Sequence, residues 1–293
     1  MTAAIYQAQH LLCPLCKKPL TCAAESKSFL CERNHTFDIA KQGYVNLLPV
    51  QQKRSKQPGD SKEMVLARKH FLELGYYQPL ADALYQQTLK SMSHSNQPAL
   101  VLDAGCGEGY YTKQLHQRLH AQSHKINTYA FDISKPAITE AAKCSAEISW
   151  FVSTIKDVPL APRSVDVLIS VFSPLQTAHF QQLLSPNGTL ITLSAGSNHL
   201  QQLKELIYTD VSTYDPDKAI KQLQPNFRLE KRQALQYTLS LTKPSHINAL
   251  LSMTPHFWKA SPDTKARLNA LEHLELDIDV QLMTFQPLEI PHE

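Results

Sequence analysis

Four side chains in the first 35 residues have the types and the spacing of zinc ligands. Cys13 and Cys16 form a C-x2-C pair, and after 14 intervening residues Cys31 and His35 form a C-x3-H pair. Thiolate and imidazole groups in two such pairs are typical of a tetrahedral structural zinc site. So short a region has too few large apolar side chains to build its own core, so the metal would contribute the folding free energy.

The alternative for these residues is a group of buried thiols that binds no metal. Cys22 lies outside both pairs, and we expect it to be a spare thiol. With protein side chains at all four positions around the metal, the site would be structural and not catalytic. We therefore predict one zinc ion per chain.

A cluster of glycines is the second feature that could do chemistry. The chain has only 8 glycines, whereas average usage would give roughly 20, and three of them are Gly105, Gly107 and Gly109. They lie in VLDAGCGEGYYT, between a predicted strand and a predicted helix. The G-x-G-x-G spacing excludes the dinucleotide fingerprint, and a P-loop sequence is absent from the chain.

The remaining pattern, D-x-G-x-G-x-G, resembles the S-adenosylmethionine loop of Rossmann-like methyltransferases. Gly105 and Gly107 allow the backbone to approach a ligand closely, and the helix that begins near Gly109 offers backbone N–H groups. Asp103 can accept from the ammonium group of the ligand. Asp132 ends the next strand, 25 residues after Gly107, where a carboxylate can accept from ribose hydroxyls. The alternative is a tight turn with a purely structural role.

The elements that must position these residues alternate between strand and helix from about residue 99. This alternation predicts a doubly wound, mostly parallel α/β sheet. The two longer segments near the C-terminus alternate in polarity and predict antiparallel edge strands. Predicted strands are 99–105, 127–134, 148–154, 164–172, 188–194, 227–241 and 275–288, and predicted helices are 64–74, 110–120, 135–144, 178–185, 199–208, 245–253 and 262–274.

Positive charge is concentrated near the N-terminus. Residues 17–70 contain 11 Lys and Arg against 5 Asp and Glu, although the whole chain has 29 against 26. Within this region, residues 51–63 predict a basic loop, and the helix that follows would end at Gly75. The charge favours either a solvated basic face or a contact with nucleic acid.

Three segments follow from these patterns. We predict a zinc-binding module at 1–46, a basic loop and helical linker at 47–85, and a methyltransferase domain at 86–293. The longest apolar run is too short to cross a bilayer and the N-terminus does not read as a signal peptide, so we expect a cytoplasmic location with reduced thiols. No membrane or DNA partner is expected.

Several segments together resemble the bacterial 23S ribosomal RNA (guanine-N1)-methyltransferases of the RlmA family. They are CPLC with the C-x3-H pair, GYVNLLPVQQKRSKQPGDSKEM, ELGYYQPL, LDAGCGEGYYT and LLSMTPHFWKA, and the resemblance extends over about 11–285. It implies a Rossmann-like class I fold, S-adenosylmethionine, one structural zinc, a 23S rRNA hairpin as substrate that the zinc-binding module recognises, and a homodimer. The family's zinc ligands match Cys13, Cys16, Cys31 and His35, and its cofactor contacts match Tyr77, Gly107, Glu108 and His199.

The sequence departs from the family in two places. The loop reads DAGCGEG where DIGCGEG is common, and the connector between Cys16 and Cys31 is slightly long. Neither departure changes a ligand. From the residues alone, Tyr77 would be a packing aromatic and His199 a surface histidine, so their assignment depends on the resemblance.

The expected reaction is methylation of N1 of a guanosine that has left its base stack. Ser173 and Pro174 follow a predicted strand, where such enzymes contact the target base. The group that removes the N1 proton could be an Asp, a His or water, and the sequence does not distinguish between them. The alternatives are a methyltransferase for small molecules of the quinone type and a non-catalytic RNA-binding zinc protein.

Overall fold

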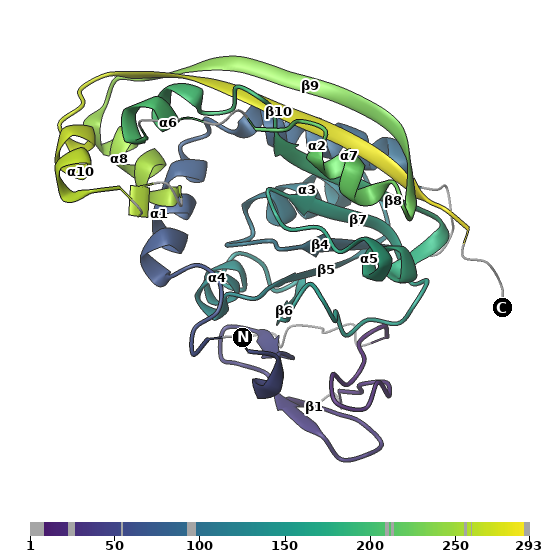
Figure 1. Ribbon diagram of the computed structural model, residues 1–293. Helices are drawn as coiled ribbons and strands as arrows, with labels where there is room; N and C mark the ends of the chain where they lie inside the picture. The colour runs from purple at the N-terminus through teal and green to yellow at the C-terminus, as the bar shows by residue number, and fades with distance from the viewer. Residues whose placement is uncertain are drawn as a thin grey trace.

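The protein is built around one large sheet with helices on both faces (Figure 1). The computed structural model describes residues 9–22, 27–53, 55–92, 98–208, 211, 214–254, 257, 258 and 260–289. Arg54 of the predicted basic loop lies outside the described residues, as do the outer limits that we predicted for the first and last segments, residues 1 and 293.

The sheet has the strand order expected of a doubly wound α/β fold. Its first six strands run parallel to their neighbours, and the last two are antiparallel. This arrangement confirms the predicted Rossmann-like fold class. In order across the sheet, the strands are β3 (Tyr44–Asn46), β6 (Ser149–Val152), β5 (Ile126–Asp132), β4 (Ala99–Ala104), β7 (Val165–Val171), β8 (Leu184–Ala195), β10 (Leu274–Pro287) and β9 (Phe227–Leu241).

One predicted edge strand lies inside the sheet. Strand β10 pairs with β8 on one side and with β9 on the other, so among the two antiparallel strands only β9 is an edge. The burial of β10 agrees with this position, because Ile278, Val280, Leu282 and Met283 are all buried. Alternating polarity marks one solvated face of a strand and does not tell an edge strand from an inner one.

The helices form two layers. On one face of the sheet, α1, α2, α3, α6, α8 and α10 share one apolar cluster, and on the other face α5 and α7 share a second. Of the described helices, none has the length and apolarity needed to cross a bilayer. The helices are α1 (Lys62–Glu73), α2 (Gln78–Ser91), α3 (Tyr110–Ala121), α4 (Lys135–Ala141), α5 (Thr177–Leu183), α6 (Gln201–Ile207), α7 (Lys218–Leu223), α8 (Pro244–Met253) and α10 (Pro262–Asn269), with a short 3-10 turn η1 (Val50–Gln52).

Strand β4 shows why the sheet needs both layers. All six of its residues are buried, and their side chains alternate between the two clusters, with Ala99 and Val101 in one and Leu100, Leu102 and Ala104 in the other. A strand that is apolar on both faces is stable only between two layers of helices. The chain directly after β4 is therefore held from both sides of the sheet.

The N-terminal module shares its core with the sheet. Its hairpin consists of β1 (Ser28–Leu30) and β2 (Thr36–Asp38), and the next strand, β3, pairs in parallel with β6 of the large sheet. Phe29 and Val45 are fully buried in the same cluster as Phe151. The module therefore takes its apolar core from the sheet, in addition to any contribution from a metal.

Candidate zinc and cofactor sites

The four predicted zinc ligands form a single cluster. One ligand atom from each of Cys13, Cys16, Cys31 and His35 lies within 4.8 Å of all the others. Cys16 Sγ is 3.7 Å from Cys31 Sγ, and His35 Nδ1 is 3.4 Å from Cys13 Sγ and 3.5 Å from Cys31 Sγ. Tetrahedral zinc with ordinary bond lengths separates two sulfurs by about 3.8 Å and a sulfur from a nitrogen by about 3.6 Å.

The donor set therefore fits zinc, and the backbone explains why. Each pair belongs to a tight turn: Lys17 N donates to Cys13 O at 2.8 Å, and Asn34 N donates to Cys31 O at 2.8 Å. Lys17 and Asn34 have left-handed backbones, with φ of 60° and 63°. Cys22 is not in the cluster, in agreement with its prediction as a spare thiol.

The glycine cluster lies at the carboxyl end of β4, where the strand order changes direction. Strand β5 lies on one side of β4 and β7 on the other, and ligands of doubly wound sheets bind at such a point. Gly105, Gly107 and Gly109 all have positive φ, of 83°, 57° and 84°. A Cβ atom on Gly105 would collide with Ser173 after β7, so this loop closely approaches the neighbouring strand.

The two predicted aspartates face this loop. Asp132, the last residue of β5, accepts from Gly107 N at 3.0 Å and from Ser134 N at 2.7 Å. Asp103 is buried; one of its carboxyl oxygens accepts from Thr112 Oγ1, and Oδ1 has no hydrogen-bond partner among the described residues. A carboxylate oxygen has two lone pairs, so both side chains retain acceptor capacity for a ligand.

Glu108 adds a third carboxyl group, and Arg68 approaches it from α1. Glu108 Oε2 is buried without a hydrogen-bond partner among the described residues, and Arg68 Nη1 is 4.0 Å away. Arg68 Nη2 is 2.6 Å from Asp60 Oδ2. Arg68 belongs to the basic region 17–70. Only the folded chain shows that it lies beside Glu108 in the glycine loop.

Burial raises the pKa of all three carboxyl groups. It raises the pKa of Asp103 to about 7 and that of Glu108 to about 7, and it also raises the pKa of Asp132. Burial opposes the charge of Arg68, but Asp60, Glu108 and Asp132 together raise its pKa. The crevice therefore favours a cation, because positive charge would stabilise carboxylates that are held away from water.

Tyr77 and His199 come together from distant parts of the chain. Tyr77 lies before α2 and is 3% exposed, and His199 lies after β8 and is 9% exposed, so it is not the surface histidine that its sequence alone suggests. Their ring centroids are 6.5 Å apart. His199 stacks on Phe172, with centroids 5.5 Å apart and an angle of 18° between the rings.

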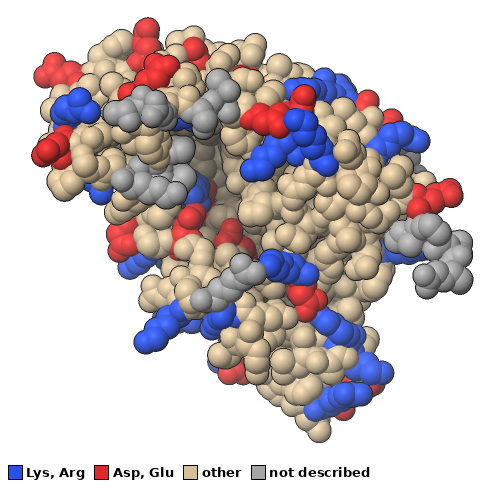
Figure 2. All heavy atoms as spheres, in the orientation of Figure 1, with Lys and Arg blue, Asp and Glu red and all other residues tan. Residues whose placement is uncertain are grey.

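These features test whether S-adenosylmethionine fits the crevice. Its sulfonium and ammonium groups are cationic, and the crevice has two buried carboxyl oxygens, on Asp103 and Glu108, without hydrogen-bond partners among the described residues. The space beside Gly107 is open: among the described residues, the only atom within 4 Å of a Cβ there would be Arg68 Nη1. The residues fit. Figure 2 shows a hollow in this face with acidic atoms inside it.

Removing one zinc ligand should release the metal. We expect elemental analysis to find about one zinc per chain in the wild type and almost none in Cys16→Ala, with a large loss of stability because metal binding contributes to folding. Cys22→Ala is the matched control, since Cys22 lies outside the cluster. A zinc-free wild type with intact thiols, or equal zinc loss in both variants, would contradict the assignment.

Comparison with known proteins identifies the families whose sequences match this chain. The N-terminal RlmA family, a zinc ribbon, matches residues 11–56, and a methyltransferase domain matches 101–188. A Bacillus subtilis protein named as a 23S rRNA (guanine-N1)-methyltransferase is 33% identical over 92% of this chain and 95% of its own. The 23S rRNA (guanine(748)-N1)-methyltransferase of Streptomyces fradiae is 30% identical over 88% and 89% of the two chains.

A third relative, from Micromonospora griseorubida, is also named as a 23S rRNA (guanine-N1)-methyltransferase. It is 32% identical over 95% of this chain and 98% of its own. The three relatives match nearly end to end, across both the zinc ribbon and the sheet domain. The chain therefore belongs to the family of 23S rRNA (guanine-N1)-methyltransferases.

Proposed function

We propose that this protein transfers the methyl group of S-adenosylmethionine to N1 of a guanosine in a 23S rRNA hairpin. The observation that carries this proposal is that the same chain contains a zinc ribbon and an acidic crevice beside the glycine loop at the carboxyl end of β4. Its three near full-length relatives have the corresponding names. Neither rival needs both parts: a quinone-type methyltransferase would use the crevice alone, and a non-catalytic RNA-binding zinc protein would use the zinc ribbon alone.

The residues that would hold the cofactor lie at the carboxyl ends of β4 and β5. Asp132 would accept from the ribose hydroxyls, and Asp103 would accept from the ammonium group, because each has the remaining acceptor capacity. Glu108 stabilises the cationic end. The backbone at Gly105, Gly107 and Gly109 lets the ligand approach, and Tyr77 and His199 close the site from the linker side and from the segment after β8.

The cofactor supplies a methyl group that its sulfonium charge already activates, so the protein contributes mainly positioning and exclusion of water. The buried carboxyl groups orient the donor, and Arg68 of α1 lies beside Glu108. Guanine N1 transfers its proton to an Asp, a His or water. No residue of this chain is assigned that role.

The base enters beside Ser173 and Pro174. Phe172 directly precedes them, has a left-handed backbone with φ of 49° and is 44% exposed, although it is a large aromatic residue. An exposed ring next to the cofactor crevice supports the binding of an unstacked base, because proteins hold such bases by stacking on aromatic side chains.

The RNA lies along the N-terminal part of the chain. We assign RNA recognition to 1–46, the basic loop and linker to 47–85, and methyl transfer to 86–293, supported by the concentration of positive charge in 17–70. An rRNA substrate places the protein in the cytoplasm. A homodimer, which the family resemblance implies, is tested by sedimentation of the purified protein.

A methylation map of ribosomal RNA tests the substrate. In cells that lack this protein, mass spectrometry should find one guanosine of 23S rRNA without its N1 methyl group. The wild-type gene should restore it, and a Gly107→Arg variant should not. An unchanged map would overturn the rRNA substrate.

A second measurement separates this function from that of a quinone-type enzyme. RNA binding should weaken steeply as the salt concentration rises, and the protein should not methylate small substrates.

Cofactor affinity should rise with pH between about pH 6 and pH 8. Asp103 and Glu108 each have a pKa of about 7, and a bound cation lowers both values, so binding releases protons. Calorimetry at pH 7 in two buffers of different ionisation enthalpy measures this release. Glu108→Gln should reduce it, and S-adenosylhomocysteine, which lacks the sulfonium, should release less. Identical heats in both buffers would contradict the expectation.

Gly107→Arg should weaken S-adenosylmethionine binding by more than about a hundredfold, which corresponds to about 2.7 kcal/mol. The new side chain fills the open space beside the loop and brings a charge that repels the cofactor. Gly43→Arg is the matched control, because Gly43 also has a positive φ and no atom of the described part of the chain within 4 Å of its Cβ position. Both variants should fold; unchanged affinity in Gly107→Arg would refute the loop assignment.

A further inference from the structure

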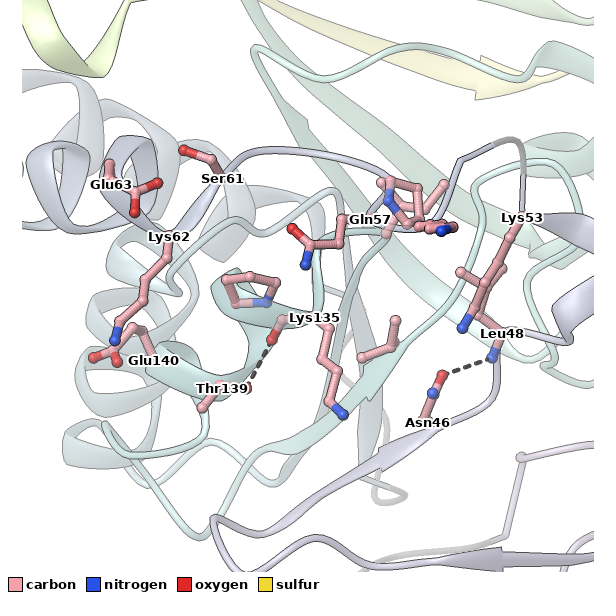
Figure 3. Close-up of a pocket in the computed structure, with 15 residues that line it drawn as sticks. Asn46, Leu48, Lys53, Gln57, Ser61, Lys62, Glu63, Lys135, Thr139 and Glu140 are labelled. Atoms are coloured by element: carbon pink, nitrogen blue, oxygen red, sulfur yellow. Dashed lines mark hydrogen bonds between the residues drawn. The ribbon is translucent and has the colours of Figure 1, made fainter.

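A lysine-rimmed cavity lies next to the cofactor crevice. It has a volume of about 510 Å³ and lies between the loop after η1, the carboxyl ends of β3 and β6, and the start of α4 (Figure 3). Lys53, Lys56, Lys62 and Lys135 line it. Figure 3 shows Lys53 and Lys135 on opposite sides, one from the loop and the other from α4. The basic loop predicted from the sequence contains the other three lysines, whereas Lys135 lies outside it.

The wall of this cavity is fixed in place. Ser134, which caps α4, donates from Oγ to Asp60 O at 2.8 Å, and this bond ties the loop to the helix. Gly59 packs so closely on Ser134 that a Cβ atom would collide with it. The lysines from the loop and Lys135 are therefore held around the same space.

The positive charge of the cavity is only partly offset from within. No carboxylate of the described residues lies within 4.0 Å of the ammonium nitrogen of any of the four lysines. Two glutamates also line the cavity. Glu140 contacts Lys69 at 3.4 Å and Lys143 at 2.5 Å. The pKa of Glu63 is lowered by its own backbone N–H, by Ser61 and by the charge of Lys62, so two glutamates face four lysines and an excess of positive charge remains.

The charge of the cavity excludes the cofactor as the ligand of this rim. S-adenosylmethionine is cationic and has no phosphate, so it suits the neighbouring carboxyl groups and not four lysines. The floor of the cavity is apolar, with Leu48, Ile133, Pro136 and Val152. An apolar floor below a ring of ammonium groups is complementary to a nucleotide, whose sugar and base pack on the floor while its phosphate faces the lysines.

Neighbouring residues of the chain belong to the cavity and to the crevice. Ile133 lines the cavity and directly follows Asp132, which holds the glycine loop. A guanosine that enters the crevice must leave its stack, and enzymes that act on such bases also hold the flanking nucleotides. A nucleotide adjacent to the target base would therefore lie at the cavity.

We propose that this cavity binds the RNA nucleotide next to the target guanosine, with its backbone phosphate between the loop lysines and Lys135. The assignment rests on the proposed function and adds one defined phosphate site to it. It makes Lys135, which belongs to α4 and not to the basic N-terminal region, a direct RNA contact.

The test compares RNA binding by Lys62→Gln/Lys135→Gln with that of the wild type. The probe is a fluorescently labelled synthetic 23S rRNA hairpin, titrated at several salt concentrations between about 50 and 200 mM. The affinity should fall about tenfold or more, and the slope of log K against log salt should decrease in magnitude by about 1 for the one lost phosphate contact. A scrambled hairpin should lose affinity by the same factor, because a phosphate contact is independent of sequence.

Lys90→Gln/Lys125→Gln is the matched control with the same change of net charge. Lys125 directly precedes β5 and Lys90 lies in the last turn of α2, and neither lines the cavity. This variant should bind the hairpin as the wild type does. Equal loss in both double variants, or no loss in Lys62→Gln/Lys135→Gln, would overturn the phosphate site.

Two further measurements keep the outcomes distinct. Calorimetry should give unchanged S-adenosylmethionine affinity in Lys62→Gln/Lys135→Gln; a matching loss there would instead assign the cavity to the cofactor. Thermal unfolding checks that both variants are folded. If the wild-type gene restores rRNA methylation while the lysines prove dispensable for RNA binding, only the cavity assignment fails. If the wild-type gene restores no methylation, the proposed function fails.

Discussion

The burial of three carboxyl groups around one glycine loop is the constraint on which the rest of the site depends. Asp103, Glu108 and Asp132 are contributed by β4, its following loop and β5, and burial raises the pKa of each. Arg68 is the cation that contacts this group, and it belongs to α1 in the linker. The position of α1 is therefore coupled by charge to the crevice. A cationic cofactor would take over part of the stabilisation that Arg68 provides, so the linker and the donor site cannot be considered separately.

Charge also divides the face of the molecule into two parts. Carboxyl groups surround the crevice, whereas the cavity beside it has lysines that no described carboxylate pairs with. The two ligands in the proposed reaction have opposite charges, one a sulfonium and the other a polyanion. Adjacent sites of opposite sign keep each ligand in its own place while their reacting atoms meet.

The features that the structure shares with the prediction are those that depend on local spacing. The grouping of the four Cys and His side chains and the position of the glycine loop directly after β4 are each specified within a few residues, so their motifs were sufficient. The role of the loop residues in holding the cofactor stays a prediction. Strand β3 was not predicted, because Tyr44–Asn46 is only three residues long and is stabilised by pairing with β6, about 100 residues later. The same reason applies to Lys135 and Arg68. Their roles depend on which loop or helix packs against them, which no local pattern contains.

Strand β3 has a consequence for substrate selection. It continues the large sheet into the zinc ribbon, and Phe29 and Val45 are buried together with Phe151. The ribbon is thus not a tethered domain that can search for RNA independently of the crevice. Its distance from the carboxyl end of β4 is fixed by the hydrogen bonds between β3 and β6 and by the packing of the shared core. An RNA held at both places presents for reaction only the nucleotide that lies at this one separation, whatever other guanosines the hairpin contains.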